Sequence, residues 1–252
     1  MKVYFLDYGW LEGDINWMVA LKCYATKSKK APLLTWEKFP EYGVLIEQEG
    51  KRFLYDTGSH PDDCDRSERF PFYYKRGQGI VEQLALIGLK PTDIHAVVLS
   101  HIHDDHIGNI GLFAHADIYI SRAEYEMALA YREEKRACRD LAAMKHTMLV
   151  EHDIFIASDL ELKCLPGHSC GLLGLYIHAG SEPWFFVSDA VNTRDNYNDL
   201  PKAAVGLYDE KLYFETLKRI KSIEKEKHAH IFFGHDREQF EKLNKCPAYY
   251  LL

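Results

Sequence analysis

Three histidines and two aspartates fall within six consecutive residues, and their spacing suits the binding of divalent metal ions. The segment 101–106 reads His-Ile-His-Asp-Asp-His and follows an apolar run that is typical of a buried strand. Residues two apart on an extended segment can share one face, so His101 and His103 can reach one ion. Asp105 and His106 follow where the chain turns, so they can reach a second ion. Imidazoles and carboxylates that converge on one point are ligands that such ions take in proteins.

Three later segments each end an apolar strand with a side chain that can bind metal. His168 follows a Pro-Gly turn, Asp189 follows the apolar run 184–187, and His235 follows a Gly at the end of a fourth strand. Sheet-based enzymes usually assemble their sites at the carboxyl ends of strands. Singly, each residue is more commonly a buried histidine or a helix cap. Together with the first segment they make seven candidate ligands for two ions: His101, His103, Asp105, His106, His168, Asp189 and His235.

The order of these ligands resembles that of the metallo-β-lactamase-fold hydrolases, whose pattern is His-x-His-x-Asp-His followed by a His, an Asp and a His. The match covers essentially the whole chain. Segments 121–126, 166–169 and 231–236 look most like those of the N-acyl homoserine lactone lactonases. The resemblance implies an α/β fold, in which residues 1–252 form a single domain. This domain is expected to be a four-layer αββα sandwich with the metals at one edge.

The resemblance also assigns the ligands to two divalent ions. It gives the first ion to His101, His103 and His168, and it gives the second ion to Asp105, His106 and His235. Asp189 is expected to bridge the two ions. Zinc is the default ion, although iron, manganese or cobalt can occupy sites of nitrogen and oxygen ligands.

The expected reaction is hydrolysis of a lactone, with N-acyl homoserine lactones, the quorum-sensing signals, as the expected substrates. Two cations lower the pKa of a shared water towards ~7, which supplies hydroxide for attack on an ester carbonyl at neutral pH. Asp105 is the expected catalytic residue, because a carboxylate ligand can also carry a proton to the leaving oxygen. Asp56 and Asp236 are candidates to orient ligand imidazoles. The alternative for Asp56 is that it stabilises its own turn.

Two segments outside the regular pattern are rich in aromatic residues. Residues 59–79 include Phe70 and Phe72, and residues 8–40 include three of the four tryptophans, among them Trp17. Aromatic side chains in a surface loop need a place to be buried. These segments are expected either to wall a pocket that holds an apolar acyl chain, or to pack on the scaffold or at a dimer interface.

One position departs from the pattern of the homoserine lactonases. That group carries a Tyr three residues after the bridging Asp, where it helps to position the substrate carbonyl, and here the position is Asn192. An Asn side chain can donate a hydrogen bond but is shorter than a Tyr side chain. Tyr197, five residues further on, is a possible substitute if its loop reaches the site.

Composition agrees with one ordinary enzyme domain, and the resemblance implies that its partner is a small-molecule lactone or ester substrate. The chain has 252 residues, 47% of them hydrophobic and 27% charged, so it can bury a large core. A net charge of -7 argues against nucleic acid as a partner. The first residues resemble no signal peptide, and no apolar stretch reaches membrane-spanning length. We therefore expect a cytoplasmic protein without a membrane partner, either a monomer or a homodimer.

Local patterns predict the elements that must position these residues. A hairpin is expected from strands 42–47 and 52–55, and Ser121 with Glu124 forms a plausible capping box for a helix that extends to about residue 136. Further helices are expected at 80–87 and about 210–225, and strands at 94–99, 118–120, 160–165, 172–177, 184–187 and around 231. The six cysteines, at 23, 64, 138, 164, 170 and 246, lack Cys-x-x-Cys spacing and are expected to be reduced packing residues.

Three other functions remain open. A thioesterase that resembles glyoxalase II has nearly the same metal pattern, and a lactonase for another ring, such as a pyridoxolactone-like one, would share the mechanism. A metal-stabilised sensor without turnover is the third. The number of ligands argues against the sensor, because a purely structural zinc needs four closed ligands.

Overall fold

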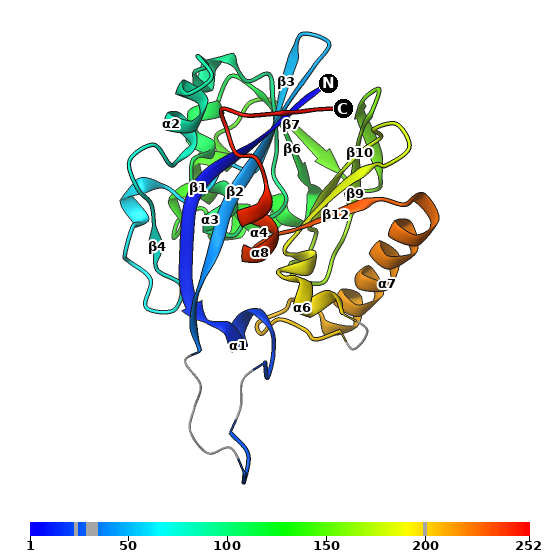
Figure 1. Cartoon of the computed structure of the whole chain (residues 1–252). Coiled ribbons are helices and arrows are strands. Elements are labelled where there is room, and N and C mark those ends of the chain that lie inside the picture. Colours follow the sequence, from blue (N-terminus) through cyan, green and yellow to red (C-terminus); the bar gives the residue numbers. More distant parts are fainter. Residues whose placement is uncertain (23–24, 29–34, 199–200) are drawn as a thin grey trace.

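Two β-sheets pack face to face, and helices cover their outer faces (Figure 1). The computed structural model describes residues 1–22, 25–28, 35–198 and 201–252. The larger sheet of the described chain contains β1 (Lys2–Asp14), β2 (Trp36–Gln48), β3 (Lys51–Tyr55), β4 (Phe72–Tyr73), β5 (Ala96–Val98), β6 (Asp117–Ser121), β7 (Thr147–Val150) and β13 (Tyr250–Leu251). The smaller contains β8 (Ile154–Ala157), β9 (Leu160–Cys164), β10 (Leu173–Ile177), β11 (Trp184–Ser188) and β12 (His230–Phe233).

The topology brings parallel strands together in each sheet. The order is β13-β1-β2-β3-β5-β6-β7 in the larger sheet, with β4 beside β1, and β12-β11-β10-β9-β8 in the smaller sheet. Strands β3, β5, β6 and β7 run parallel to one another, and so do β11 and β12. The carboxyl ends of β3 and β5 therefore share one edge of the larger sheet, and those of β11 and β12 share one edge of the smaller.

Short helices connect the strands, and one long helix covers the smaller sheet. They are α1 (Ile15–Met18), α2 (Ile80–Ala85), α3 (Asp104–Ile107), α4 (Arg122–Tyr131), α5 (Arg136–Ala142), α6 (Arg194–Tyr197), α7 (Glu210–Lys227) and α8 (Arg237–Lys242). Helix α7 begins after Asp209, whose side chain accepts a hydrogen bond from the Leu212 amide at 2.9 Å. It ends at Lys227 and is capped by His228, which adopts a left-handed conformation with a φ of 54°.

Alternating side chains on the strands build the layers. On β3, Phe53 and Tyr55 point into the core between the two sheets, whereas Leu54 points into the core beneath the helices of the larger sheet. On the outer face of the smaller sheet, Leu217 and Ile220 of α7 pack in a third core. Each sheet thus buries both of its faces. The expected four-layer αββα sandwich is confirmed.

Each predicted strand is present. Strand β2 begins at Trp36 and not at residue 42 as predicted, whereas the ends of the other strands lie within about two residues of those expected. The turn of the β2–β3 hairpin consists of Glu49 and Gly50, with φ values of 50° and 76°. Positive φ at both central residues is the conformation that tight two-residue hairpins favour.

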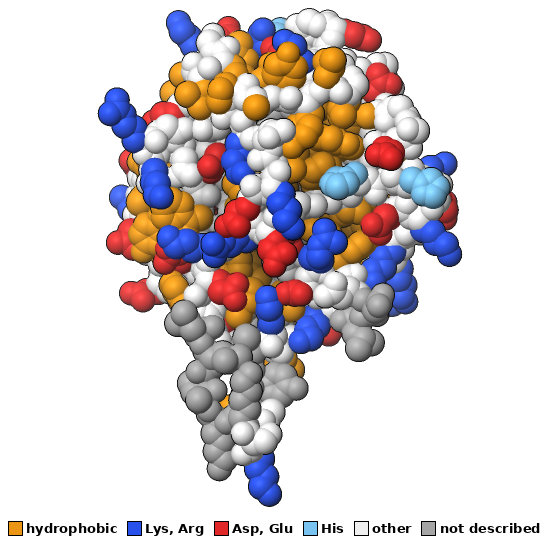
Figure 2. Space-filling model, viewed as in Figure 1, with side chains coloured by type: hydrophobic (Ala, Val, Ile, Leu, Met, Phe, Trp, Pro, Cys, Tyr) orange, Lys and Arg blue, Asp and Glu red, His pale blue; other side chains and the backbone are white. Residues whose placement is uncertain are grey.

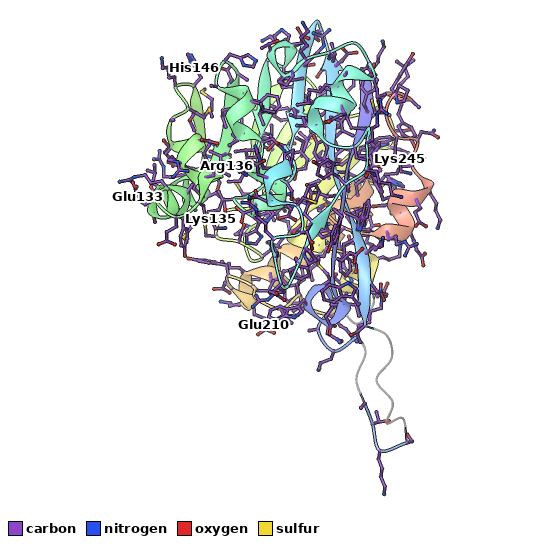
Figure 3. The ribbon with its side chains drawn as sticks, turned by 90° about the vertical axis from the view of Figure 1, so that its left-hand side faces the viewer. Glu133, Lys135, Arg136, His146, Glu210 and Lys245 are labelled. Carbon is purple, nitrogen blue, oxygen red and sulfur yellow. The ribbon has the colours of Figure 1, made fainter. Side chains whose placement is uncertain are left out.

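The predicted helix that extends to about residue 136 is wrong, because α4 ends at Tyr131 and α5 begins at Arg136. The Nη2 atom of Arg136 lies 2.6 Å from Oδ2 of Asp63, and the Asp62 carboxylate lies 3.7 Å from Nη1. Figure 3 shows Arg136 on the face where α5 meets the segment that contains these aspartates. This ion pair across the chain joins the start of α5 to the 59–79 segment.

Half of the predicted capping box is also wrong. The Ser121 hydroxyl accepts a hydrogen bond from the Glu124 amide at 3.2 Å, as a helix cap does. The Glu124 carboxylate, however, turns away from Ser121 and accepts hydrogen bonds from two other loops.

Acidic and basic side chains are interspersed on the face shown in Figure 2. Among the described helices, none has the length and apolar character needed to cross a membrane. Cys64, Cys138, Cys164, Cys170 and Cys246 are free thiols, as expected, and Cys23 lies outside the described residues.

Candidate metal centre

The seven candidate ligands meet where the strand ends of both sheets come together. His101 follows β5, Asp189 follows β11, and His235 follows β12. His168 lies in the connection between β9 and β10. Asp105 belongs to the short helix α3 that follows β5. Strand ends are fixed by their hydrogen bonds to neighbouring strands, so they hold these side chains in one place.

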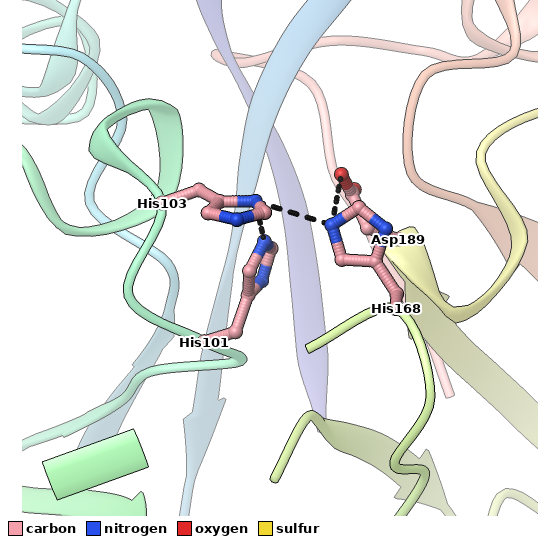
Figure 4. Close-up of side chains that lie close together, drawn as sticks. All are labelled: His101, His103, His168 and Asp189. Carbon is pink, nitrogen blue, oxygen red and sulfur yellow. Dashed lines mark hydrogen bonds and ion pairs between the residues drawn. The ribbon is translucent and has the colours of Figure 1, made fainter. Parts of the chain in front are cut away.

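The first group of ligands contains His101, His103, His168 and Asp189, and all its ligand atoms lie within 4.8 Å of one another (Figure 4). The Nδ1 atom of His103 lies 2.8 Å from Nε2 of His101 and 3.1 Å from Nε2 of His168. The same Nε2 of His168 is 3.4 Å from Oδ2 of Asp189. Three imidazoles and one carboxylate therefore face a common point.

The second group contains Asp105, His106, Asp189 and His235, again within 4.8 Å of one another. The Nε2 atom of His106 lies 3.4 Å from Oδ2 of Asp105 and 3.4 Å from Oδ1 of Asp189. The Nε2 atom of His235 lies 3.1 Å from the same Asp189 oxygen. Asp189 thus directs Oδ2 to the first group and Oδ1 to the second, so the two groups share one carboxylate.

Unpaired polar atoms show that these residues fit metal ions. Nε2 of His106, Oδ1 of Asp189 and Nε2 of His235 are buried, and among the described residues none has a hydrogen-bond partner of normal geometry. Buried polar atoms without partners are costly and rare in folded proteins. Nitrogen and oxygen atoms that converge without hydrogen-bond partners suit divalent ions, and the two groups fit a pair of such ions.

Burial dominates the electrostatics of the first group. Burial holds the pKa of His101 well below its usual value, and the nearby His106 imidazole lowers it further. Burial also lowers the pKa of His168 to about 3. Both imidazoles are therefore neutral at pH 7, which is the form that binds metal.

Charge pairing dominates the second group. Burial alone would raise the pKa of Asp105, but the His106 and His235 imidazoles hold it below its usual value. Burial alone would lower the pKa of His235, but the Asp189 carboxylate raises it to about 9. In the absence of metal, this half of the site is therefore a set of ion pairs.

Asp56 orients one of the ligand imidazoles, as predicted. Its Oδ2 lies 2.8 Å from Nδ1 of His106. The amide and hydroxyl of Ser100 donate to the same carboxylate at 2.7 Å and 2.8 Å. His235 is held differently, since its Nδ1 lies 2.9 Å from the carbonyl oxygen of Pro40.

The predicted role of Asp236 as an orienting residue is wrong. Its carboxylate accepts hydrogen bonds from the amide of Gln239 at 2.8 Å and from the amide of Arg194 at 2.7 Å. Asp236 is therefore the cap of α8. The chain turns into this helix directly after His235, which carries the Asp236 side chain away from the imidazole.

A glycine and a strained serine allow the strand ends to approach closely. A Cβ atom at Gly234 would lie 2.5 Å from Oδ1 of Asp189, so this position in the Gly-His motif has no room for a side chain. Ser188 has a φ of 47°, which is unfavourable for a residue with a side chain. Its hydroxyl donates to Ser100 at 3.1 Å, which joins it to the hydrogen bonds around Asp56.

A cleft of about 770 Å³ opens above the ligands. Its walls include Trp17, Phe70 and Phe72, and its floor includes Asp105 and His168. The aromatic segments therefore form a pocket above the candidate metals. Phe72 also packs in a small core cluster, so this residue serves the scaffold as well.

Asn192 lines the cleft, whereas Tyr197 does not. Asn192 is 3% exposed, its Oδ1 has no hydrogen-bond partner among the described residues, and its Nδ2 donates to the sulfur of Met18 at 3.5 Å. The Tyr197 hydroxyl donates to Glu224 at 2.8 Å, and its ring lies against Phe233. The idea that Tyr197 reaches the site is therefore wrong.

Sequence reasoning missed a buried carboxyl beside the cleft. Glu41 is 2% exposed, and the amide and hydroxyl of Ser59, a residue that lines the cleft, both donate to it. Burial and the Asp105 carboxylate raise the pKa of Glu41 to about 8. Strand β2 also contains Glu37, Lys38 and Glu47, so no signal in the sequence distinguishes Glu41.

Cys170, two residues after the ligand His168 in the sequence, is held as a protonated thiol. Burial and the Glu124 carboxylate raise the pKa of Cys170 to about 12, and its sulfur donates to Glu124 at 3.2 Å. A protonated thiol is a poor metal ligand. This agrees with a packing role for Cys170.

Comparisons with known proteins agree with this geometry. Residues 37–235 match the model of the metallo-beta-lactamase superfamily. The chain is 29% identical to the N-acyl homoserine lactonase AiiB of Agrobacterium fabrum, over 97% of this chain and 96% of that protein. It is 32% identical to an N-acyl homoserine lactonase of Bacillus cereus, over 83% of this chain and 86% of that protein.

Two solved structures of N-acyl homoserine lactone hydrolases also resemble this chain. An N-acyl homoserine lactone hydrolase with N-hexanoyl-L-homoserine at its catalytic metal centre superposes with a TM-score of 0.84 and 28% identity, over 99% of this chain and 98% of that chain. A mutant of the AiiA protein of Bacillus thuringiensis, with N-decanoyl-L-homoserine bound at its active site, gives the same TM-score, identity and coverage. The predicted family is confirmed. The chain belongs to the metallo-beta-lactamase superfamily, and N-acyl homoserine lactonases are among its relatives there.

Proposed function

We propose that this protein is a metal-dependent lactonase that opens the ring of N-acyl homoserine lactones. The observation that carries the proposal is the position of Asp189, which is shared by two groups of metal ligands at the floor of a cleft with aromatic walls. The relatives that share the whole fold are named for this activity, and two of their structures hold the opened products.

The proposed metals are two zinc ions, although the same donors suit iron, manganese or cobalt. His101, His103 and His168 would hold one ion, and Asp105, His106 and His235 would hold the other. The Asp189 carboxylate would contact both. When bound, such ions polarise a carbonyl group and make a water molecule nucleophilic at neutral pH.

Asp105 is the proposed proton carrier. It lines the cleft, and its Oδ2 lies 3.4 Å from Nε2 of His106 and 3.5 Å from Nε2 of His235. In the reaction, the water oxygen bonds to the lactone carbonyl carbon while the bond from that carbon to the ring oxygen breaks. Asp105 would take a proton from the water and give it to the ring oxygen, which becomes the product hydroxyl.

The substrate contacts are proposed from the lining of the cleft. Phe70, Phe72 and Trp17 would hold the acyl chain, because an apolar chain gains most from aromatic walls that are already in place. The side-chain amide of Asn192 would hydrogen-bond to the polar end of the substrate. The buried Oδ1 atom of Asn192 lacks a hydrogen-bond partner among the described residues. Within the same residues, its Nδ2 atom donates one long hydrogen bond, to the sulfur of Met18 at 3.5 Å.

A panel of substrates tests this proposal. Metal-replete protein is mixed with N-acyl homoserine lactones of several chain lengths, simple γ- and δ-lactones and a glutathione thioester, and the products are identified by mass spectrometry. Selective opening of the acyl homoserine lactones is the expected result. Turnover of only the thioester, or of only other lactones, would replace the proposed substrate, and tight binding without product would favour a sensor.

Several sequence-based expectations stay predictions. These are a single domain over residues 1–252, a cytoplasmic location, a monomer or homodimer, and the lack of a nucleic-acid or membrane partner.

A further inference from the structure

One buried carboxylate joins the two loops that carry the histidines of the first group. Glu124, in the first turn of α4, is 0% exposed. Its Oε2 accepts a hydrogen bond from the amide of Ile102 at 3.1 Å. Its Oε1 accepts hydrogen bonds from the amide of Gly171 at 2.7 Å and from the sulfur of Cys170 at 3.2 Å. Each carboxylate oxygen therefore holds a different loop.

The residues that donate these hydrogen bonds lie within three residues of metal ligands in the sequence. Ile102 lies between His101 and His103, so a hydrogen bond from its amide fixes the backbone that presents both imidazoles. Gly171 lies three residues after His168. The carboxylate of Glu124 thus fixes the separation of three histidines that come from two distant parts of the chain.

Close packing at Gly171 supports the same arrangement. An added Cβ atom at this position would overlap the hydroxyl of Ser121, the residue that caps α4. The loop after His168 is therefore pressed against the start of the helix that carries Glu124. The second group of ligands is held by other contacts, from Asp56 to His106 and from Pro40 to His235.

We infer that Glu124 is a positioning residue that holds the two histidine loops at the separation required by the first metal ion. The inference rests on the proposed assignment of His101, His103 and His168 to that ion. A carboxylate suits the role because it has only acceptor atoms and can serve several donors at once. An amide in its place would turn an NH2 group towards a backbone amide and leave a buried donor unpaired.

Metal titration of single-site backgrounds tests the inference. The His235→Ala background keeps the first group intact, and the His168→Ala background keeps the second. In each, metal-free protein is titrated with Co²⁺ and followed by absorption, with and without Glu124→Gln. In the His235→Ala background, we expect Glu124→Gln to raise the Kd for Co²⁺ by roughly 10- to 100-fold, the range seen when residues that support metal ligands are changed. In the His168→Ala background, we expect the Kd to stay the same.

The control variant lies on the same helix as Glu124. Glu126 is an exposed residue of α4, and Glu126→Gln should leave both titrations unchanged. An equal loss in both backgrounds, or no loss in either, would overturn the inference. If Glu124→Gln does not fold, Glu124→Asp decides in the same way, because its shorter side chain keeps the charge but cannot span both loops. No lactone enters these titrations, so their outcome is separate from that of the substrate panel.

Discussion

The carboxylate of Asp56 lies 2.8 Å from Nδ1 of His106, and Nε2 of the same ring faces Asp105 and Asp189. When the imidazole is neutral, a hydrogen bond from Nδ1–H to Asp56 fixes the tautomer in which Nε2 carries the free lone pair. Asp56 follows strand β3, whereas His106 belongs to α3 after β5. The ends of two neighbouring parallel strands therefore cooperate to aim one metal ligand.

Replacing Asp56 should weaken metal binding through this contact. We expect Asp56→Asn to raise the Kd of one of two metal ions by about 10- to 100-fold, because the neutral amide holds the imidazole less strongly. Metal content after dialysis against a graded chelator series measures the change. Retention of both ions at the wild-type chelator concentration would contradict the role of Asp56.

Replacing Asp236 should lower stability but leave metal binding unchanged. Since its carboxylate caps α8, Asp236→Ala should lower the free energy of unfolding by about 0.5 to 2 kcal/mol. The same dialysis should show unchanged metal content, because the His235 imidazole is held by the carbonyl of Pro40. Chemical denaturation of the metal-free protein measures the stability. Loss of metal without loss of stability would show that Asp236 supports a ligand after all.

Local spacing explains why the metal ligands were predictable. In segment 101–106 the spacing of the side chains alone indicates the ligands, and His168, Asp189 and His235 were recognisable because each follows an apolar strand. The layered fold followed from the family resemblance, with the strand positions supported by local patterns.

Contacts between distant parts of the chain explain what the sequence did not reveal. Glu124 was interpreted as part of a local capping box, yet its partners, Ile102 and Gly171, lie 22 and 47 residues away. The break between α4 and α5 falls in the charged stretch 132–135, and the ion pair from Arg136 to Asp63 becomes visible only in the folded chain. Such contacts leave no periodic pattern for a local reading to find.

Phe70 should determine the preference for long acyl chains. It lines the cleft and is only partly buried, so Phe70→Ala should remove a wall for the substrate at small cost to the fold. We expect kcat/KM to fall more for a decanoyl than for a butanoyl homoserine lactone, by about 10-fold for the lost contact area. Steady-state kinetics with both substrates gives the ratio. Equal losses for the two chain lengths would show that Phe70 does not contact the chain.

Metal binding to the second group should release protons. The pKa of His235 is raised to about 9 in the metal-free protein, so this imidazole is largely protonated at pH 7.5 and must lose its proton to bind metal. Apparent affinity should therefore rise with pH between about 7 and 9. Calorimetric titration with Zn²⁺ in two buffers of different ionisation enthalpy measures the protons. Identical enthalpies in the two buffers would contradict the ion-paired state of the empty site.

The central claim is that Asp105 acts in metal-dependent opening of a lactone, and acid release from N-hexanoyl homoserine lactone tests it most directly. The metal-replete protein should release acid, while the chelated protein and Asp105→Asn at matched metal content should be slower by at least about 100-fold. Asp117→Asn, the same change at an exposed residue of β6 that does not line the cleft, is the matched control and should keep the wild-type rate. A wild-type rate from Asp105→Asn, or from the chelated protein, would contradict the account.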